Sequence, residues 1–153
     1  MELRDRISTG SKVPDYIAKL TRLIRKQRDA NTKWGKPYCV LWVLRCLSVV
    51  HGFNARRILR LSYKDASDAK DALARYGFDT TQEAAQAVLG QPKPIMHAKY
   101  GDIVSLNEIP SLDVIDAGLG RALGVCYGSV SFFASSAGLV SIPTRTCFEA
   151  YNG

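Results

Sequence analysis

The chain has 153 residues, a mass of 16.8 kDa and a formal charge of +7, which fits one domain around a single hydrophobic core. Hydrophobic residues make up 46% of it, enough to exclude a wholly disordered chain. There is no run of about 18 apolar residues to span a membrane, and residues 1–6 lack the apolar core of a secretory signal, so we expect synthesis in the cytoplasm of the producing cell.

The positive charge is concentrated at the N-terminal end. Residues 1–37 contain ten Lys or Arg and four Asp or Glu, a net charge of +6, whereas residues 38–153 carry only +1. We interpret residues 1–14 as a basic N-terminal arm and residues 15–153 as a single domain. The basic side chains form either a solvated helix face or a contact with an anionic partner. No aromatic side chains alternate with them to stack bases, so nucleic acid is not the expected partner.

The first half of the chain predicts helices. Apolar side chains recur with helical spacing over residues 15–29, where Asp15 is a suitable N-cap. The apolar run 38–50 is too long for an ordinary strand and predicts a buried central helix. An amphipathic helix is expected to follow over residues 67–76, and another short helix over residues 81–89.

The second half predicts strands. Short β-prone runs are separated by Gly- and Ser-containing turns, and they cover residues 102–106, 122–127, 130–134 and 139–142. Runs spaced this closely favour an antiparallel meander over parallel crossovers. The predicted fold class is therefore α+β, with N-terminal helices and a buried central helix packed on a small antiparallel sheet.

The cysteines give no support for a metal or disulfide site. Cys39, Cys46, Cys126 and Cys147 are irregularly spaced and include no C-x-x-C pair. We expect no cofactor and no metal, and we interpret the last three cysteines as small buried hydrophobic residues.

Cys39 is the candidate for chemistry because it would begin the predicted central helix. Free N–H groups and the helix dipole stabilise a thiolate at that position. A nucleophilic thiolate also needs a histidine within hydrogen-bond reach and a third group to orient that histidine. The alternative is that Cys39 is another small buried hydrophobic residue.

Four segments, in order, carry a resemblance to a known family: Trp34-Gly35-Lys36-Pro37-Tyr38-Cys39, Arg60-Leu61-Ser62-Tyr63, Gly101-Asp102-Ile103-Val104 and Leu123-Gly124-Val125-Cys126-Tyr127-Gly128. With the helices between them, the chain from about Asp15 to Tyr151 resembles the phage-associated NlpC-like family of unknown function. Through that family it is similar to the NlpC-type papain-like cysteine peptidases of phage tails and bacterial cell walls. The resemblance implies a papain-like fold with Cys39 at the nucleophile position.

The sequence departs from the pattern of the active enzymes. Tyr38 stands where the family usually has an Asp, and Ala122 stands where active members carry the catalytic histidine. The chain holds two histidines. His51 would lie about 18 Å from Cys39, at the other end of the same helix. His97, in a loop before Gly101-Asp102, is the single remaining candidate base.

We therefore expect an inactive NlpC-type domain that serves as a structural component of a phage tail tip or hub and is located in the virion. Its expected partners are other tail proteins, such as distal tail or tape-measure proteins. The alternative is an active cysteine peptidase or amidase that cleaves peptides of host peptidoglycan during DNA entry, with Cys39 as nucleophile and His97 as base. A third interpretation, a binder of nucleic acid or an anionic surface, depends on residues 1–37 alone.

Overall fold

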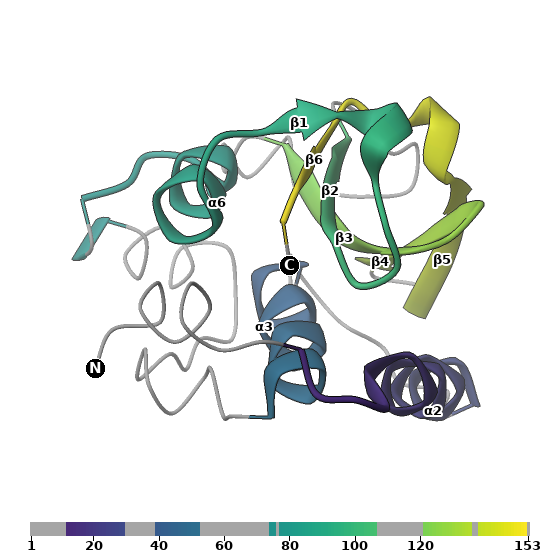
Figure 1. Ribbon diagram of the computed structural model, residues 1–153. Coiled ribbons are helices and arrows are strands. Elements are labelled where there is room, and N and C mark those ends of the chain that lie inside the picture. Colours follow the sequence, from purple (N-terminus) through teal and green to yellow (C-terminus); the bar gives the residue numbers. More distant parts are fainter. Residues whose placement is uncertain are drawn as a thin grey trace.

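The computed structural model describes residues 12–29, 39–52, 74–75, 77–106, 121–135 and 138–152. Within these ranges the chain has the predicted α+β fold, with helices on an antiparallel sheet (Figure 1). The helices are α2 (Tyr16–Asp29), α3 (Cys39–His51) and α6 (Thr81–Leu89). The strands are β1 (Lys93–Pro94), β2 (Ile103–Leu106), β3 (Ala122–Tyr127), β4 (Val130–Ser135), β5 (Gly138–Pro143) and β6 (Glu149–Tyr151). The described residues also include the 3-10 turns η1 (Ile95–His97) and η2 (Thr144–Thr146).

The sheet has the order β1-β6-β2-β3-β4-β5, and every neighbouring pair is antiparallel. The four predicted strands form the meander β2 to β5, which confirms that part of the prediction. β6, close to the C-terminus, pairs with β2 on the side opposite β3. Val104 of β2 therefore lies between Gly124 of β3 and Ala150 of β6. β1 and β6, which the sequence did not predict, extend the sheet by strands of two and three residues.

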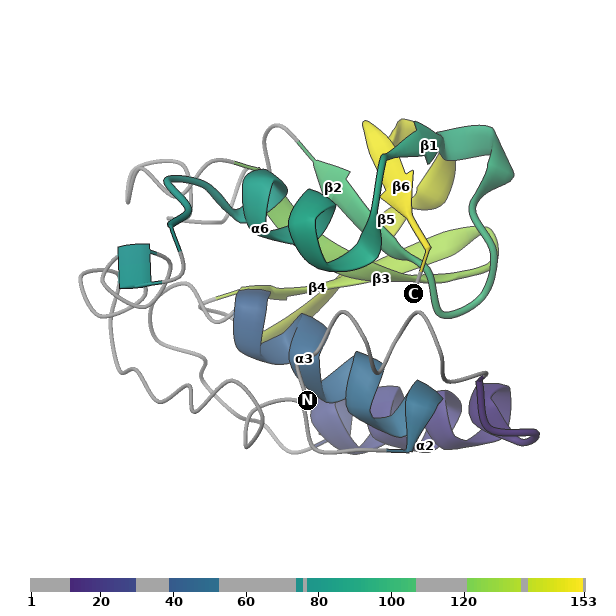
Figure 2. The same cartoon turned by 60° about the vertical axis from the view of Figure 1, so that its left-hand side comes forward.

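Helices α2 and α3 cover one face of the sheet (Figures 1 and 2). Alternate strand residues, such as Ile103, Leu123 and Val125, join the buried cluster that contains the helix side chains. Trp42 lies in this cluster with no exposed surface, and its Nε1–H donates a 3.0 Å hydrogen bond to the backbone oxygen of Phe132. The α3 helix is therefore tied to β4 by both packing and a hydrogen bond.

The other face of the sheet is also apolar. The alternate strand residues, with Cys147 from the segment before β6, form a second buried cluster: Val104, Ala122, Cys126, Phe133, Cys147 and Ala150. Ile95 of η1 and the adjacent Ala98 pack against this cluster. Because both faces are buried, β3 has nearly continuous burial in place of the apolar–polar alternation of a half-exposed strand.

The helix predictions agree with the structure wherever it describes them. α2 begins one residue after the expected cap, and α3 covers the predicted buried helix from residue 39 and ends one residue beyond it, at His51. At α6, the cap is Thr80, whose side chain accepts a hydrogen bond from the backbone N–H of Glu83, while the Glu83 carboxylate accepts one from Asp79 N–H. Of the helix predicted over 67–76, only residues 74 and 75 are described, and both are helical. No helix among the described residues is long and apolar enough to cross a membrane.

The last residues of the predicted basic arm pack on the domain. Val13 N–H donates a 2.9 Å hydrogen bond to Val50 O, near the end of α3. Lys12 Nζ lies 3.9 Å from a carboxylate oxygen of Asp102 and 5.0 Å from the ring centre of Tyr16. The remainder of the arm, residues 1–11, lies outside the described residues.

Candidate functional site

Cys39 is the first residue of α3, at the helix end where the sequence placed a nucleophile. One turn later, the hydrogen bond from Trp42 to Phe132 O fixes this end of α3 against β4. Because β3 and β4 are antiparallel, β3 begins and β4 ends on the same side of the sheet. α3 begins beneath these strand ends (Figure 2). The structure describes the backbone of Cys39 and not its side chain, and Tyr38 lies outside the described residues.

Ala122, at the position that the resemblance assigns to the catalytic histidine, begins β3. Its side chain is 2% exposed and belongs to the cluster on the sheet face away from the helices. The next residue, Leu123, belongs to the cluster shared with α3. A histidine at position 122 would therefore point away from α3 with this backbone.

We predict that Ala122→His destabilises the protein by about 1–3 kcal/mol and creates no hydrolase activity, because the imidazole would be forced into a filled apolar cluster. Thermal unfolding and digestion of purified peptidoglycan measure the two effects. Gln86→His, which adds the same ring at an exposed position of α6, is the matched control and should leave stability within about 0.5 kcal/mol. Peptidoglycan cleavage by the Ala122→His variant would contradict the side-chain direction described above.

Neither of the two histidines of the chain lies at the Cys39 end of α3. His51 is the last residue of that helix, as predicted. His97 is an exposed residue of η1, whose neighbours Ile95 and Ala98 pack on the opposite face of the sheet. Figure 2 shows η1, directly after β1, across the sheet from α3. The structure thus does not bring the candidate base to the candidate nucleophile.

Asp102 has a structural role in the turn before β2. Its Oδ2 accepts a 2.8 Å hydrogen bond from Lys99 N–H. The carboxylate is buried, with Lys93 Nζ at 2.6 Å and Lys12 Nζ at 3.9 Å. Since the following strand pairs with β6 and β3, this ion-paired turn fixes the start of β2. No sequence signal joins a carboxylate to lysines 9 and 90 positions before it.

Cys46, Cys126 and Cys147 are buried, as the sequence predicted. Burial raises the pKa of each thiol, and for Cys147 the pKa rises to about 11. A thiol that stays protonated and covered is a poor nucleophile. The described part of the chain also contains no group of three or more His, Cys, Asp or Glu side chains able to hold a metal ion.

These three thiols should resist alkylation in the folded protein. We expect iodoacetamide at pH 8 to modify Cys46, Cys126 and Cys147 only after unfolding in guanidinium, as peptide mass spectrometry would show. Because their folded pKa values lie above the unfolded value, burial of the thiols stabilises the fold fully below about pH 8.5, and this contribution falls as pH rises toward the folded values. A denaturant midpoint that rises between pH 8 and pH 10 would contradict this assignment.

Comparison with protein families gives one match that covers nearly the whole chain. Residues 11–152 match the domain of unknown function DUF6950. No curated protein and no solved structure matches the chain. Given the extent of the family match, the chain belongs to the DUF6950 family.

Proposed function

We propose that the chain is a structural component of a phage tail tip or hub, built on a papain-like domain of NlpC type that has no peptidase activity. A helix headed by Cys39 and packed on an antiparallel sheet supports the papain-like comparison. The observation that carries the loss of activity is the position of the two histidines, one at the far end of α3 and one across the sheet. Without a base, a cysteine lacks the group that accepts and returns the proton during peptide cleavage.

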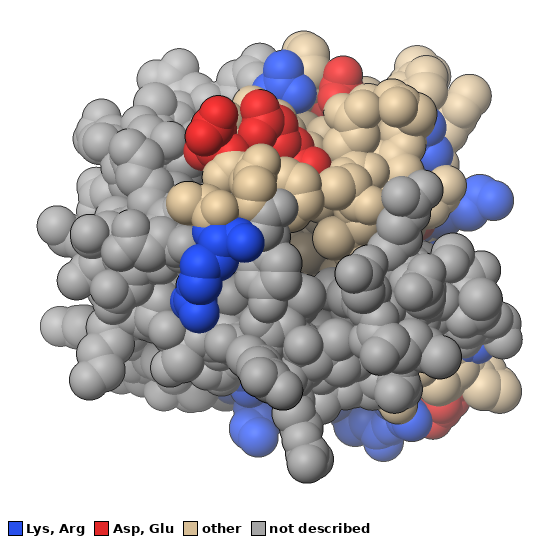
Figure 3. All heavy atoms as spheres, turned by 90° about the vertical axis from the view of Figure 1, so that its left-hand side faces the viewer, with Lys and Arg blue, Asp and Glu red and all other residues tan. Residues whose placement is uncertain are grey.

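The charge distribution supports a role in assembly. The N-terminal 37 residues carry +6 of the total charge of +7, and five of the basic residues lie on α2: Lys19, Arg22, Arg25, Lys26 and Arg28. The face around α6, in contrast, exposes Asp79 and Glu83 as well as Arg75, and both signs of charge are visible there (Figure 3). A helix rich in basic residues, together with a region around α6 that carries both signs of charge, suits attachment to a neighbouring tail protein.

Two measurements test the proposal. Purified protein and its Cys39→Ala variant should release equal, background amounts of peptide from isolated peptidoglycan. Antibodies against the chain should label the tail tip of phage particles in immunogold electron microscopy. Peptide release that Cys39→Ala abolishes would establish the active peptidase or amidase in place of the inactive domain, and particles without label would contradict the virion assignment.

A further inference from the structure

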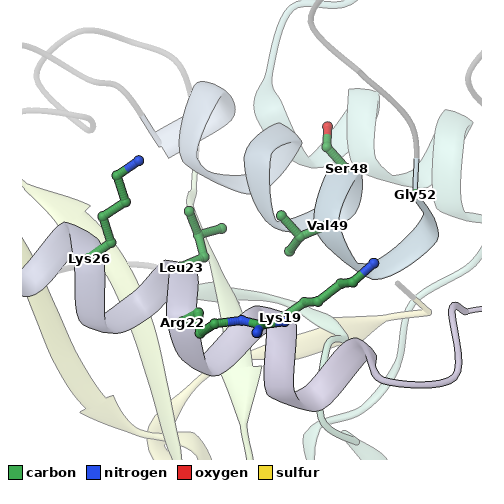
Figure 4. A pocket seen from close by; sticks show the side chains of 7 residues that line it. All are labelled: Lys19, Arg22, Leu23, Lys26, Ser48, Val49 and Gly52. Carbon is green, nitrogen blue, oxygen red and sulfur yellow. The ribbon is translucent and has the colours of Figure 1, made fainter.

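A groove of about 370 Å³ runs between α2 and α3. Leu23 and Val49 supply its apolar surface, one from each helix, and both are only partly buried against the core. Lys19, Arg22 and Lys26 line it from α2, and Ser48 and Gly52 line it from the end of α3 (Figure 4).

Among the residues that the structure describes, every charged side chain lining the groove is positive. Lys19, Arg22 and Lys26 are spaced at i, i+3 and i+7, so they form one stripe along α2 with Leu23 beside them. None of the described residues that line the groove is Asp or Glu. Arg22 and Lys26 are four residues apart, a spacing at which like charges destabilise a helix by about 0.2–0.5 kcal/mol. Negative charge bound along this stripe would remove that repulsion.

Lys19 has an acidic neighbour, but the pair leaves the lysine available. Its Nζ lies 3.7 Å from Asp15 Oδ1, and the two side chains are 41% and 56% exposed. An ion pair that exposed contributes little, about 0–1 kcal/mol, because water and salt screen it. A carboxylate of a partner can therefore replace Asp15 at low cost.

We infer that this groove binds an acidic amphipathic helix of a partner protein. An apolar ridge on that helix would contact Leu23 and Val49, and flanking Asp or Glu side chains would pair with Lys19, Arg22 and Lys26. No described lining residue is aromatic, so the described surface has no ring on which a base could stack, which favours a peptide over single-stranded nucleic acid. The inference rests on the proposed function only in taking the partner to be another protein of the same assembly.

A synthetic helical peptide of about 15 residues, with Leu at i, i+3 and i+7 and Glu on both flanks, is the probe. Titrated into the ¹⁵N-labelled full chain, it should shift amide signals of residues 19–26 and 48–52. The double variant Arg22→Glu/Lys26→Glu should bind it about tenfold more weakly. Arg25→Glu changes an exposed α2 cation that does not line the groove, so it is the matched control and should alter affinity less than about twofold.

Other outcomes would overturn the inference. An equal loss of affinity in Arg25→Glu would indicate unspecific attraction to a basic helix. Equal binding of a peptide with its Leu residues replaced by Ser would exclude the apolar contact. Tighter binding of a single-stranded oligonucleotide of about 15 nucleotides through Arg22 and Lys26 would assign the surface to nucleic acid. A groove that binds no peptide would leave tail-tip labelling and the hydrolysis result unchanged, so this test fails separately from that of the proposed function.

Discussion

Trp42→Ala is expected to lower the free energy of unfolding by about 3–5 kcal/mol. The indole has no exposed surface and lies between α3 and the sheet, in the largest buried cluster described. Its removal leaves a cavity at the joint between the two layers and breaks the hydrogen bond to Phe132 O. Because the free energy of unfolding of a small domain is about 5–15 kcal/mol, this loss should shift the urea midpoint to a much lower concentration.

Two further variants separate the cavity from the hydrogen bond. Trp42→Phe keeps a ring and removes the N–H donor, so it should cost clearly less, about 1–2 kcal/mol. Met96→Ala, at a side chain that is 90% exposed, should change stability by less than about 0.5 kcal/mol. Equal losses for Trp42→Ala and Trp42→Phe would contradict the view that the indole fills the space between α3 and β4.

The fold was predictable wherever a segment carried its own pattern. α2 and α3 have apolar spacing long enough to identify a helix, and the meander strands are β-prone runs bounded by turns. β1 and β6 have two and three residues, which is too short for any alternation to be read. Their strand character comes from pairing between Lys93 and Ala150 and between Ile103 and Tyr151, contacts distant in sequence.

The candidate site was predictable in position but not in side-chain direction. The position of Cys39 at the start of the buried helix follows from local sequence alone. The direction of Ala122 depends on which set of alternate β3 residues faces α3, and both sets are apolar: Leu123 and Val125 on one face, Ala122 and Cys126 on the other. A shift of one residue exchanges the two faces, so a strand buried on both sides carries no sequence signal for the choice.

Asp102→Ala is expected to lower the free energy of unfolding by about 3 kcal/mol. The carboxylate is 2% exposed, and it accepts the hydrogen bond from Lys99 N–H and pairs with Lys93 at 2.6 Å. Removing it leaves the turn before β2 without its acceptor and leaves the partly buried Lys93 ammonium without its carboxylate. Thermal unfolding measures the loss. Asp102→Asn retains an acceptor for the turn, so it should recover part of the stability while the ion pair stays broken.

Substitution of the two lysine partners should reduce stability to different extents, because the lysines differ in their distance from the carboxylate and in their exposure. Lys93→Met should lower the free energy of unfolding by about 1–2 kcal/mol, because it removes the 2.6 Å ion pair of a buried carboxylate. Lys12→Met should cost less than about 1 kcal/mol, since Lys12 Nζ lies 3.9 Å away and the side chain is 26% exposed. The loss of stability should decrease in the order Asp102→Ala, Lys93→Met, Lys12→Met. This order is expected if the carboxylate accepts the hydrogen bond of the turn and also pairs with both lysines. Equal losses for Asp102→Ala and Lys93→Met would mean that the ion pair accounts for the whole effect and that the hydrogen bond to Lys99 adds nothing.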